Sequence, residues 1–298
     1  MNLIEVQNLR KRYGSFEAVA DLSLAVPAGS VCGLLGPNGA GKSSTFKCLT
    51  GLARPTSGTI SIAGGPPRAA MFNDVAFVPE RSALYQNLTV ADHLTIARGS
   101  FPRYDERRAK KMLEIFSLDP KKRVRKLSKG QRAAVGLAIA FAMRPTIMIL
   151  DEPASGLDPI HQRAVLDLII EAAASGAAVL FSSHNVGQVE RAADRVVIVK
   201  NGRLVVDGDL DELREREKIV EAVFPAGADE RRFVADPRVR TVELIGNVVR
   251  LHTLRDTDAL VADLERAGAT SVTVQPQNLE ALFFAAVEQP RPVTLEAD

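Results

Sequence analysis

One octapeptide constrains the fold of this chain more than any other feature of its sequence. The residues Gly36–Ser43 read GPNGAGKS, directly after the apolar run Ser30–Leu35 and directly before the helix-like segment Ser44–Leu49. This is the complete pattern of a phosphate-binding loop in a strand–loop–helix context. Its glycines let the backbone wrap closely, so that N–H groups and the positive end of the helix can hold phosphate oxygens. A glycine-rich turn before a helix is the alternative interpretation.

The loop contributes most of the candidate nucleotide-binding residues. Lys42 is expected to neutralise the β- and γ-phosphates, and the Ser43 hydroxyl is expected to bind Mg²⁺. The residues expected to contact ATP in this segment are Gly36, Pro37, Asn38, Gly39, Ala40, Gly41, Lys42, Ser43 and Ser44. The pattern therefore predicts ATP and Mg²⁺ as ligands.

A second motif combines an apolar strand with two carboxylates. The segment Ile147–Glu152 reads IMILDE, which places Asp151 and Glu152 where the strand ends. Asp151 is expected to hold Mg²⁺ through water, and Glu152 to polarise the water that attacks the γ-phosphate. Alone, the segment could equally be a strand followed by a solvated acidic turn. The upstream phosphate-binding loop favours the catalytic interpretation.

The order of the patterns predicts an α/β fold with a mainly parallel sheet. Short apolar runs alternate with helical patterns over the first two-thirds of the chain. The strand candidates are 30–35, 75–78, 146–150, 178–182 and 195–200. In open parallel sheets, ligands bind beyond the carboxyl ends of the strands. We therefore expect the functional residues to gather at that edge.

Two regions depart from the alternation of strands and helices: a helical stretch in the middle of the chain and a separate tail at its end. Helical periodicity dominates about residues 81–145, which predicts a helical insertion. A charged run at 213–218 precedes a tail with further strands and helices, the last helix being Leu279–Glu288. We expect an ATP-binding domain at 1–212 and a small α+β accessory domain at 213–298.

Charge and hydropathy exclude several classes of protein. A formal net charge of +2 is too weak to indicate nucleic-acid binding, so no nucleic-acid partner is expected. The basic run Lys121–Lys126 favours a solvated face over contact with a membrane partner, with nucleic acid a distant third. No apolar run reaches the length of about 20 residues that a spanning helix needs. A membrane role is therefore expected to be indirect.

A third motif narrows the choice among nucleotide-binding proteins. The segment Leu127–Gln131 reads LSKGQ and lies between the phosphate-binding loop and the acidic strand. It resembles the signature motif of ATP-binding cassette proteins, with Lys129 in place of the usual second glycine. The resemblance implies that Ser128, Gly130 and Gln131 serve a nucleotide bound by the opposite subunit. A lone segment of this kind would more often be a helix cap.

The other motifs of ATP-binding cassette proteins occur in this sequence in the same order as in that family. By the resemblance, Asp158 belongs to a loop that communicates between paired sites, and His184 is the switch histidine that reaches the γ-phosphate. Tyr13 takes the place of the aromatic residue that stacks on adenine, although it could be an ordinary exposed tyrosine. Glu80 stands where the family commonly has a glutamine. A carboxylate can still bind Mg²⁺ but cannot donate a hydrogen bond as an amide does.

The resemblance covers about residues 2–212 and implies the motor subunit of an ABC transporter. Such a subunit hydrolyses ATP, forms a homodimer with ATP bound, and drives a separate transmembrane permease from the cytoplasmic face of the membrane. A segment at Pro276–Phe283 resembles the C-terminal extension of export cassettes, which favours export over import. An importer subunit or a soluble cassette ATPase outside transport remains the alternative.

Overall fold

The computed structural model describes residues 1–67, 73–81, 83–216, 218–225, 227, 231–253, 255–276 and 278–287. The chain divides into two compact units, Met1–Asp207 and Gly208–Asp298. The expected boundary after residue 212 lies slightly later than this division. In the part of the chain that the structure describes, no helix has both the length and the apolar character needed to cross a membrane.

The first unit is built on a nine-stranded sheet with the strand order β4-β1-β2-β9-β8-β3-β7-β6-β5. Its parallel part comprises β3 (Val31–Leu35), β5 (Val75–Val78), β6 (Ile147–Asp151), β7 (Ala178–Ser183) and β8 (Arg195–Lys200). These strands are almost wholly buried, because helices cover the faces of such a sheet. The predicted α/β fold with parallel strands is confirmed.

The other part of the sheet was not predicted from the sequence. The strands β1 (Asn2–Tyr13), β2 (Phe16–Pro27) and β4 (Ser57–Ile62) pair antiparallel, so the sheet is mixed. The pairing of β1 with β2 shifts register at four places, which breaks the simple alternation of buried and exposed residues. The last strand, β9 (Arg203–Asp209), lies between β2 and β8.

Three of the parallel strands are each followed by a loop and then a helix. α1 (Lys42–Leu49) follows β3, α5 (Pro159–Ala174) follows β6, and α6 (Val186–Ala192) follows β7. The core cluster packs α1 against the sheet through residues such as Phe46 and Leu49. Burial of such side chains contributes roughly 1.5–3 kcal/mol each, which fixes the start of α1 relative to the strands.

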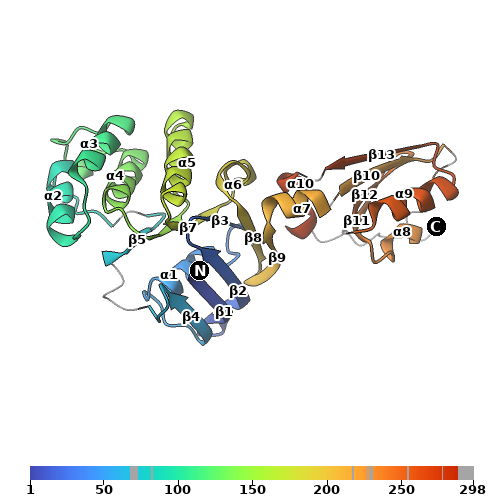
Figure 1. Cartoon of the computed structure of the whole chain (residues 1–298), viewed down its shortest axis with the longest axis horizontal. Helices are drawn as coiled ribbons and strands as arrows, with labels where there is room; N and C mark the ends of the chain where they lie inside the picture. The colour runs from blue at the N-terminus through green and yellow to red at the C-terminus, as the bar shows by residue number, and fades with distance from the viewer. Residues whose placement is uncertain are drawn as a thin grey trace. The chain divides into compact units, whose positions relative to one another are not determined.

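The helical insertion lies between β5 and β6, as the sequence indicated. It contains α2 (Val90–Ser100), α3 (Glu106–Ile115), the 3₁₀ turn η2 (Val124–Lys126) and α4 (Lys129–Ala142). The three α-helices gather beside β5 and α5 at one side of the first unit (Figure 1). Side chains cap their starts: Thr89 and Asp92 form a capping box on α2, and Asp105 caps α3.

The second unit holds a four-stranded antiparallel sheet with the order β11-β12-β10-β13. Its elements are α7 (Leu210–Arg216), β10 (Lys218–Val223), α8 (Arg231–Val234), β11 (Val239–Ile245), β12 (Val248–Thr253), α9 (Thr257–Arg266), β13 (Ser271–Pro276) and α10 (Leu279–Val287). The core packs α9 against one face of this sheet, with Leu260 and Leu264 fully buried. Gln277 and Glu288, which the sequence analysis included in this region, lie outside the described residues.

Candidate nucleotide-binding site

A cavity of about 410 Å³ opens at the carboxyl ends of the parallel strands β3, β6 and β7. The phosphate-binding loop forms one wall, and the acidic end of β6 forms another. The cavity is lined by Phe16, Ala18, Pro37, Asn38, Gly39, Ala40, Gly41, Lys42, Ser43, Ser44, Glu80, Asp151, Glu152, Ser155 and His184. Residues from five separated stretches of sequence thus line one cavity at the carboxyl edge of the parallel strands.

Two glycines of the loop are required by close backbone contacts. A Cβ on Gly36 would lie 2.5 Å from the carbonyl oxygen of Val199. A Cβ on Gly41 would lie 2.4 Å from the carbonyl oxygen of Ala18, and Gly41 has a φ of 103°, which a residue with a side chain rarely adopts. The loop can therefore run tightly against β2 and β8 before α1 begins at Lys42.

Lys42 is the positive centre of the cavity. Its side chain is almost fully buried, and its Nζ donates hydrogen bonds to the carbonyl oxygens of Gly36 at 2.6 Å and Pro37 at 3.4 Å. The same Nζ lies 3.7 Å from Oε1 of Glu152. A buried ammonium group needs such partners. Phosphate oxygens entering the loop would offer it stronger, charged acceptors.

A serine that the sequence analysis did not identify connects the side chain of Asp151 to the backbone of Glu152. The Ser182 hydroxyl donates to Oδ1 of Asp151 at 2.6 Å and accepts a hydrogen bond from the backbone N–H of Glu152 at 3.0 Å. All three residues lie where the neighbouring strands β6 and β7 end. The short apolar strand ending in two serines was the available signal for this role.

Glu152 combines an unusual backbone with a fixed side chain. Its φ of 51° lies in the left-handed region, which is costly for a residue with a side chain and recurs at functional sites. Oε2 of Glu152 lies 2.8 Å from Nδ1 of His184, whose ring is largely exposed. An ionised carboxylate only accepts hydrogen bonds, so a hydrogen bond between these two atoms requires the tautomer of His184 that carries a proton on Nδ1.

The donor set fits a magnesium–nucleotide complex rather than a free metal ion. In the part of the chain that is described, no group of three or more histidine, cysteine, aspartate or glutamate side chains could hold a metal ion. Asp151, Glu80 and the Ser43 hydroxyl lie around one cavity. Mg²⁺ typically uses one or two carboxylates together with phosphate oxygens and water, so the phosphates of ATP would supply the remaining ligands.

The structure does not place Tyr13 on the wall of this cavity, whereas it places Phe16 there. Tyr13 and Phe16 face each other at the tip of the β1–β2 hairpin. The ammonium group of Lys11 lies 4.6 Å from the centre of the Tyr13 ring, and Phe16 is 62% exposed. Phe16 was not among the contacts expected from the sequence, because the hairpin turn between the two strands is not evident there.

The signature segment belongs to a different cavity, of about 310 Å³. Ser128 caps α4, and Gln131 completes a capping box, in which its side-chain oxygen accepts the N–H of Ser128 at 3.2 Å. A Cβ on Gly130 would lie 2.4 Å from the carbonyl oxygen of Gly156, so this position requires glycine. The lining residues are Phe116, Ser117, Ser128, Gly130, Gln131, Ala134, Gly156, Leu157, Asp158 and His161.

Asp158 links this second cavity to the start of α5. Its carboxylate accepts hydrogen bonds from the backbone N–H groups of Ile160 at 3.0 Å and His161 at 3.1 Å, and it also contacts the His161 ring. The side-chain hydrogen bond with His161, followed by these backbone bonds, lowers the pKa of Asp158. Asp158 therefore stays ionised and keeps the loop attached to α5 near neutral pH.

The two cavities share no lining residue, although Ser155 lines the first and Gly156 the second. Ser128, Gly130, Gln131 and Asp158 thus lie in a different cavity of the same chain from the phosphate-binding loop. Both cavities offer polar groups and helix starts that suit phosphate. One copy of the chain therefore has two separate polar cavities of different composition.

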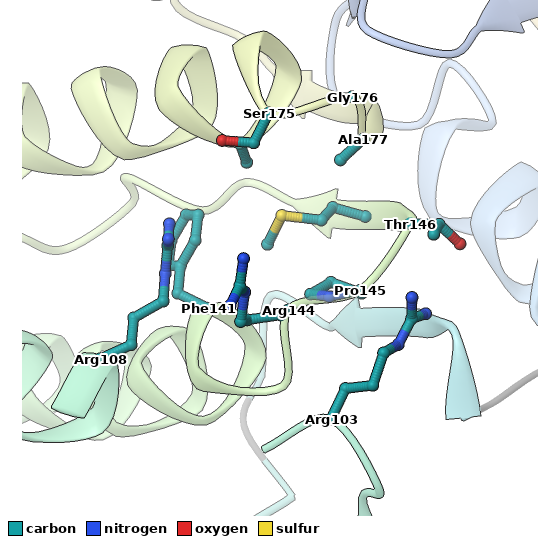
Figure 2. Close-up of a pocket in the computed structure, with 11 residues that line it drawn as sticks. Arg103, Arg108, Phe141, Arg144, Pro145, Thr146, Ser175, Gly176 and Ala177 are labelled. Carbon is teal, nitrogen blue, oxygen red and sulfur yellow. The ribbon is translucent and has the colours of Figure 1, made fainter. Parts of the chain in front are cut away.

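A third cavity, of about 430 Å³, is lined by three arginines. Figure 2 shows Arg103, Arg108 and Arg144 pointing toward the segment Ser175–Ala177 at the end of α5. Each guanidinium group already has a carboxylate partner: Arg103 pairs with Asp74, Arg108 with Glu171 at 3.3 Å, and Arg144 with Asp105 at 3.8 Å. These pairs balance the positive charge, and those with Asp74 and Glu171 join the helical insertion to its neighbours, so we do not assign this cavity to phosphate.

A family model and two curated relatives identify the same family of proteins. The family described as "ABC transporter" matches residues 19–155. Nod factor export ATP-binding protein I of Burkholderia orbicola (strain AU 1054) is 32% identical over 295 residues, which cover 94% of this chain and 95% of that protein. The linearmycin resistance ATP-binding protein LnrL of Bacillus subtilis (strain 168) is 29% identical over 303 residues, covering 95% and 97%.

A solved structure is also similar. The structure titled "Structure of ATP binding subunit of ABC transporter" superposes with a TM-score of 0.66 at 34% identity, covering 72% of this chain and 92% of that one. The similarity to this solved structure thus spans less of the chain than the similarity to the two export and resistance proteins does.

Proposed function

The chain belongs to the ATP-binding cassette transporter family, and from this premise we propose that it is the ATP-hydrolysing subunit that drives a separate transmembrane permease. One observation supports hydrolysis above all others. Glu152 contacts both Lys42 and His184 in a cavity walled by the phosphate-binding loop. A binding module without turnover would not need a carboxylate and a histidine joined in this way.

The residues of the cavity have distinct roles in this proposal. The loop and Lys42 hold the β- and γ-phosphates, and Glu152 accepts a proton from the attacking water. His184 orients Glu152 through Nδ1 and offers Nε2 to the γ-phosphate. Mg²⁺, held by Ser43 and Asp151 with Glu80 beside them, would neutralise charge that develops on the phosphates.

We assign the second cavity to the nucleotide of a second copy. Its glycine-dependent close packing and its capped helix start suit phosphate, yet it shares no residue with the phosphate-binding loop of the same chain. Two copies arranged head to tail would complete two composite sites, each with the loop of one copy and the Ser128–Gln131 segment of the other. ATP would then hold the dimer together, and hydrolysis would release it.

The proposal also includes the direction of transport, which is export, and the location of the chain in the cell. The relatives that match nearly the whole chain carry the names of Nod factor export and linearmycin resistance proteins. Their similarity extends through the second unit, which we propose to be an accessory domain of an export cassette. The permease would hold the chain at the cytoplasmic face of the membrane. An importer subunit is the second candidate.

Replacement of Glu152 by glutamine tests the proposal. The amide cannot take the proton from water, so Glu152→Gln should bind ATP but hydrolyse it at least about a hundredfold more slowly, as expected for loss of a general base. In sedimentation with Mg²⁺ and ATP at micromolar concentration, this variant should form dimers. The matched control is Glu114→Gln on the exposed surface of α3, which should turn over normally.

Two results would count against specific parts of the proposal. Normal turnover by Glu152→Gln would remove Glu152 as the base. A variant that binds ATP, fails to hydrolyse it and still sediments as a monomer would refute the ATP-dependent dimer.

A further inference from the structure

The helical insertion carries a short basic segment between α3 and α4. Its exposed cations, here called the basic strip, are Lys121, Arg123, Arg125 and Lys126. Two backbone hydrogen bonds fix the segment: the N–H of Val124 donates to the carbonyl oxygen of Leu88, and the N–H of Arg125 to that of Gln86, both at 3.0 Å. Val124 is fully buried. The segment is therefore held by its backbone and by Val124, beside α2 at the outer edge of the first unit (Figure 1).

The charged ends of the basic strip are not used within the part of the chain that the structure describes. None of the four makes a salt bridge or a side-chain hydrogen bond with another described residue. Two acidic residues adjoin the strip, and both are occupied. Asp92 accepts the N–H of Thr89 at 2.8 Å in the capping box of α2, and Asp119 accepts the N–H of Lys121 at 2.9 Å. The strip thus keeps an excess of positive charge that an external anionic surface would stabilise.

An exposed aromatic ring adjoins the basic strip. Tyr85 is 67% exposed, and its backbone N–H donates to Nε2 of His93 on α2 at 3.0 Å. Gln86, the next residue, accepts the N–H of Arg125. Exposed cations alone would form an ordinary solvated face. Tyrosine together with long basic side chains is instead typical of a membrane–water interface, where the ring lies at the level of the lipid headgroups.

The shape of the surface favours a membrane over a folded acidic protein. Neither the basic strip nor Tyr85 lines any of the three cavities described above. Protein partners are recognised through a surface of complementary shape as well as charge. An anionic bilayer needs no such fit, because each lysine or arginine near it raises the affinity about fivefold through charge alone.

We propose that the basic strip and Tyr85 bind the anionic surface of a lipid bilayer, an inference that rests on the location at the membrane proposed above. The strip gives the chain an affinity for the bilayer that is separate from any contact with a permease. The loop before α4 then faces the headgroups. Because the attraction is electrostatic, it weakens as salt screens the charges.

The test uses the purified full chain and lipid vesicles that contain no protein. Flotation with phosphatidylcholine vesicles, with and without about 30% phosphatidylglycerol, gives the partition coefficient on a neutral and on an anionic surface. The chain should bind the anionic vesicles and not the neutral ones. Raising the salt concentration from about 0.1 M to about 0.5 M should lower binding at least about tenfold.

Substitutions locate the contact on the chain. The combined variant Lys121→Gln, Arg123→Gln and Arg125→Gln should lower the partition coefficient at least about thirtyfold, because three charges leave the bilayer surface. A matched control with the same net charge carries glutamine at three exposed cations outside the helical insertion: Arg10, Lys47 and Arg203. The control should bind within about threefold of the parent, because remote charges are screened.

Tyr85→Ala tests the aromatic part of the surface. It should lower the partition coefficient about threefold, because a ring is lost from the level of the headgroups, while the dependence on salt remains. Unchanged binding would exclude Tyr85 from the contact.

ATP hydrolysis by the same samples separates this inference from the proposed function. The combined variant should hydrolyse ATP at the rate of the parent, which also shows that it folds. If the parent hydrolyses ATP but binds no anionic vesicles, or if the control loses as much binding as the combined variant, the membrane contact is refuted while the ATPase stands. Binding of the parent to polyglutamate but not to vesicles would refute it in favour of an acidic protein. If the parent binds through the strip but hydrolyses no ATP, the contact stands and the proposed ATPase does not.

Discussion

At Glu152, the backbone and the side chain are both held by groups that are distant in sequence. The N–H donates to Ser182, and the carboxylate contacts His184 and Lys42. A left-handed φ at a non-glycine residue persists only where its surroundings enforce it. The strand that precedes Glu152 was predictable from its apolar run. The role of Ser182 was not, because it depends on β7 lying beside β6.

Substitutions at the tip of the β1–β2 hairpin test which aromatic residue, Phe16 or Tyr13, stacks on adenine. Phe16 lines the nucleotide cavity, whereas Tyr13, expected from the sequence, does not. Phe16→Ala should weaken ATP binding by about 1–1.5 kcal/mol, because an aromatic stacking surface is lost. Tyr13→Ala should have the smaller effect. Isothermal titration of both variants with ATP measures the difference, and a larger loss in Tyr13→Ala would restore the original assignment.

At the scale of elements, continuous apolar runs made the parallel strands predictable to within about a residue. The segments 75–78 and 195–200 match β5 and β8 in full. The antiparallel strands β1 and β2 escaped prediction because their register shifts interrupt the alternation of buried residues. Motif order along the chain does not say which loops meet in space, so only the resemblance to cassette proteins led us to expect the segment Ser128–Gln131 apart from the phosphate-binding loop.

Helix α4 and the loop before α5 provide a stability test. Gly130→Ala would place a Cβ 2.4 Å from the carbonyl oxygen of Gly156, so the free energy of unfolding should fall by about 1–3 kcal/mol. Gly99→Ala on α2 meets no atom within 4 Å and should instead stabilise by roughly 0.5–1 kcal/mol. Urea unfolding of both variants checks the prediction. Equal effects would show that the contact between Gly130 and Gly156 is not tight.

In the second unit, the burial of His252 on β12 predicts that the stability of the fold depends on pH. Burial lowers its pKa below the usual value of 6.5, and its buried Nδ1 has no hydrogen-bond partner among the described residues. Between the two pKa values the unfolded chain binds more protons than the folded one, so stability is complete above about pH 6.5 and falls as the pH drops below it.

Replacement of His252 by phenylalanine should remove this part of the pH dependence. Hydrogen exchange of the β10 and β12 amides, compared at pH 7.5 and 5.5, reports on the stability of this sheet. The wild-type sheet should lose protection beyond the change in intrinsic exchange rate, and the variant should lose less. An identical loss in both proteins would show that other groups cause it.

On the scale of the whole molecule, the chain combines a cassette unit with a second unit that has its own core. The similarity to the export and resistance proteins runs over both units, whereas the similarity to the solved ATP-binding subunit covers 72% of the chain. This difference favours a role for the second unit that is particular to a subset of cassettes.

The association with a permease is the claim that most directly separates a transporter subunit from other cassette ATPases. The measurement is purification of the tagged full chain from detergent-solubilised native membranes, with and without ATP, followed by mass spectrometry against an untagged control. We predict enrichment of a protein with several membrane-spanning helices. Enrichment of ribosomal or DNA-maintenance proteins, with no membrane protein above the control, would contradict the account.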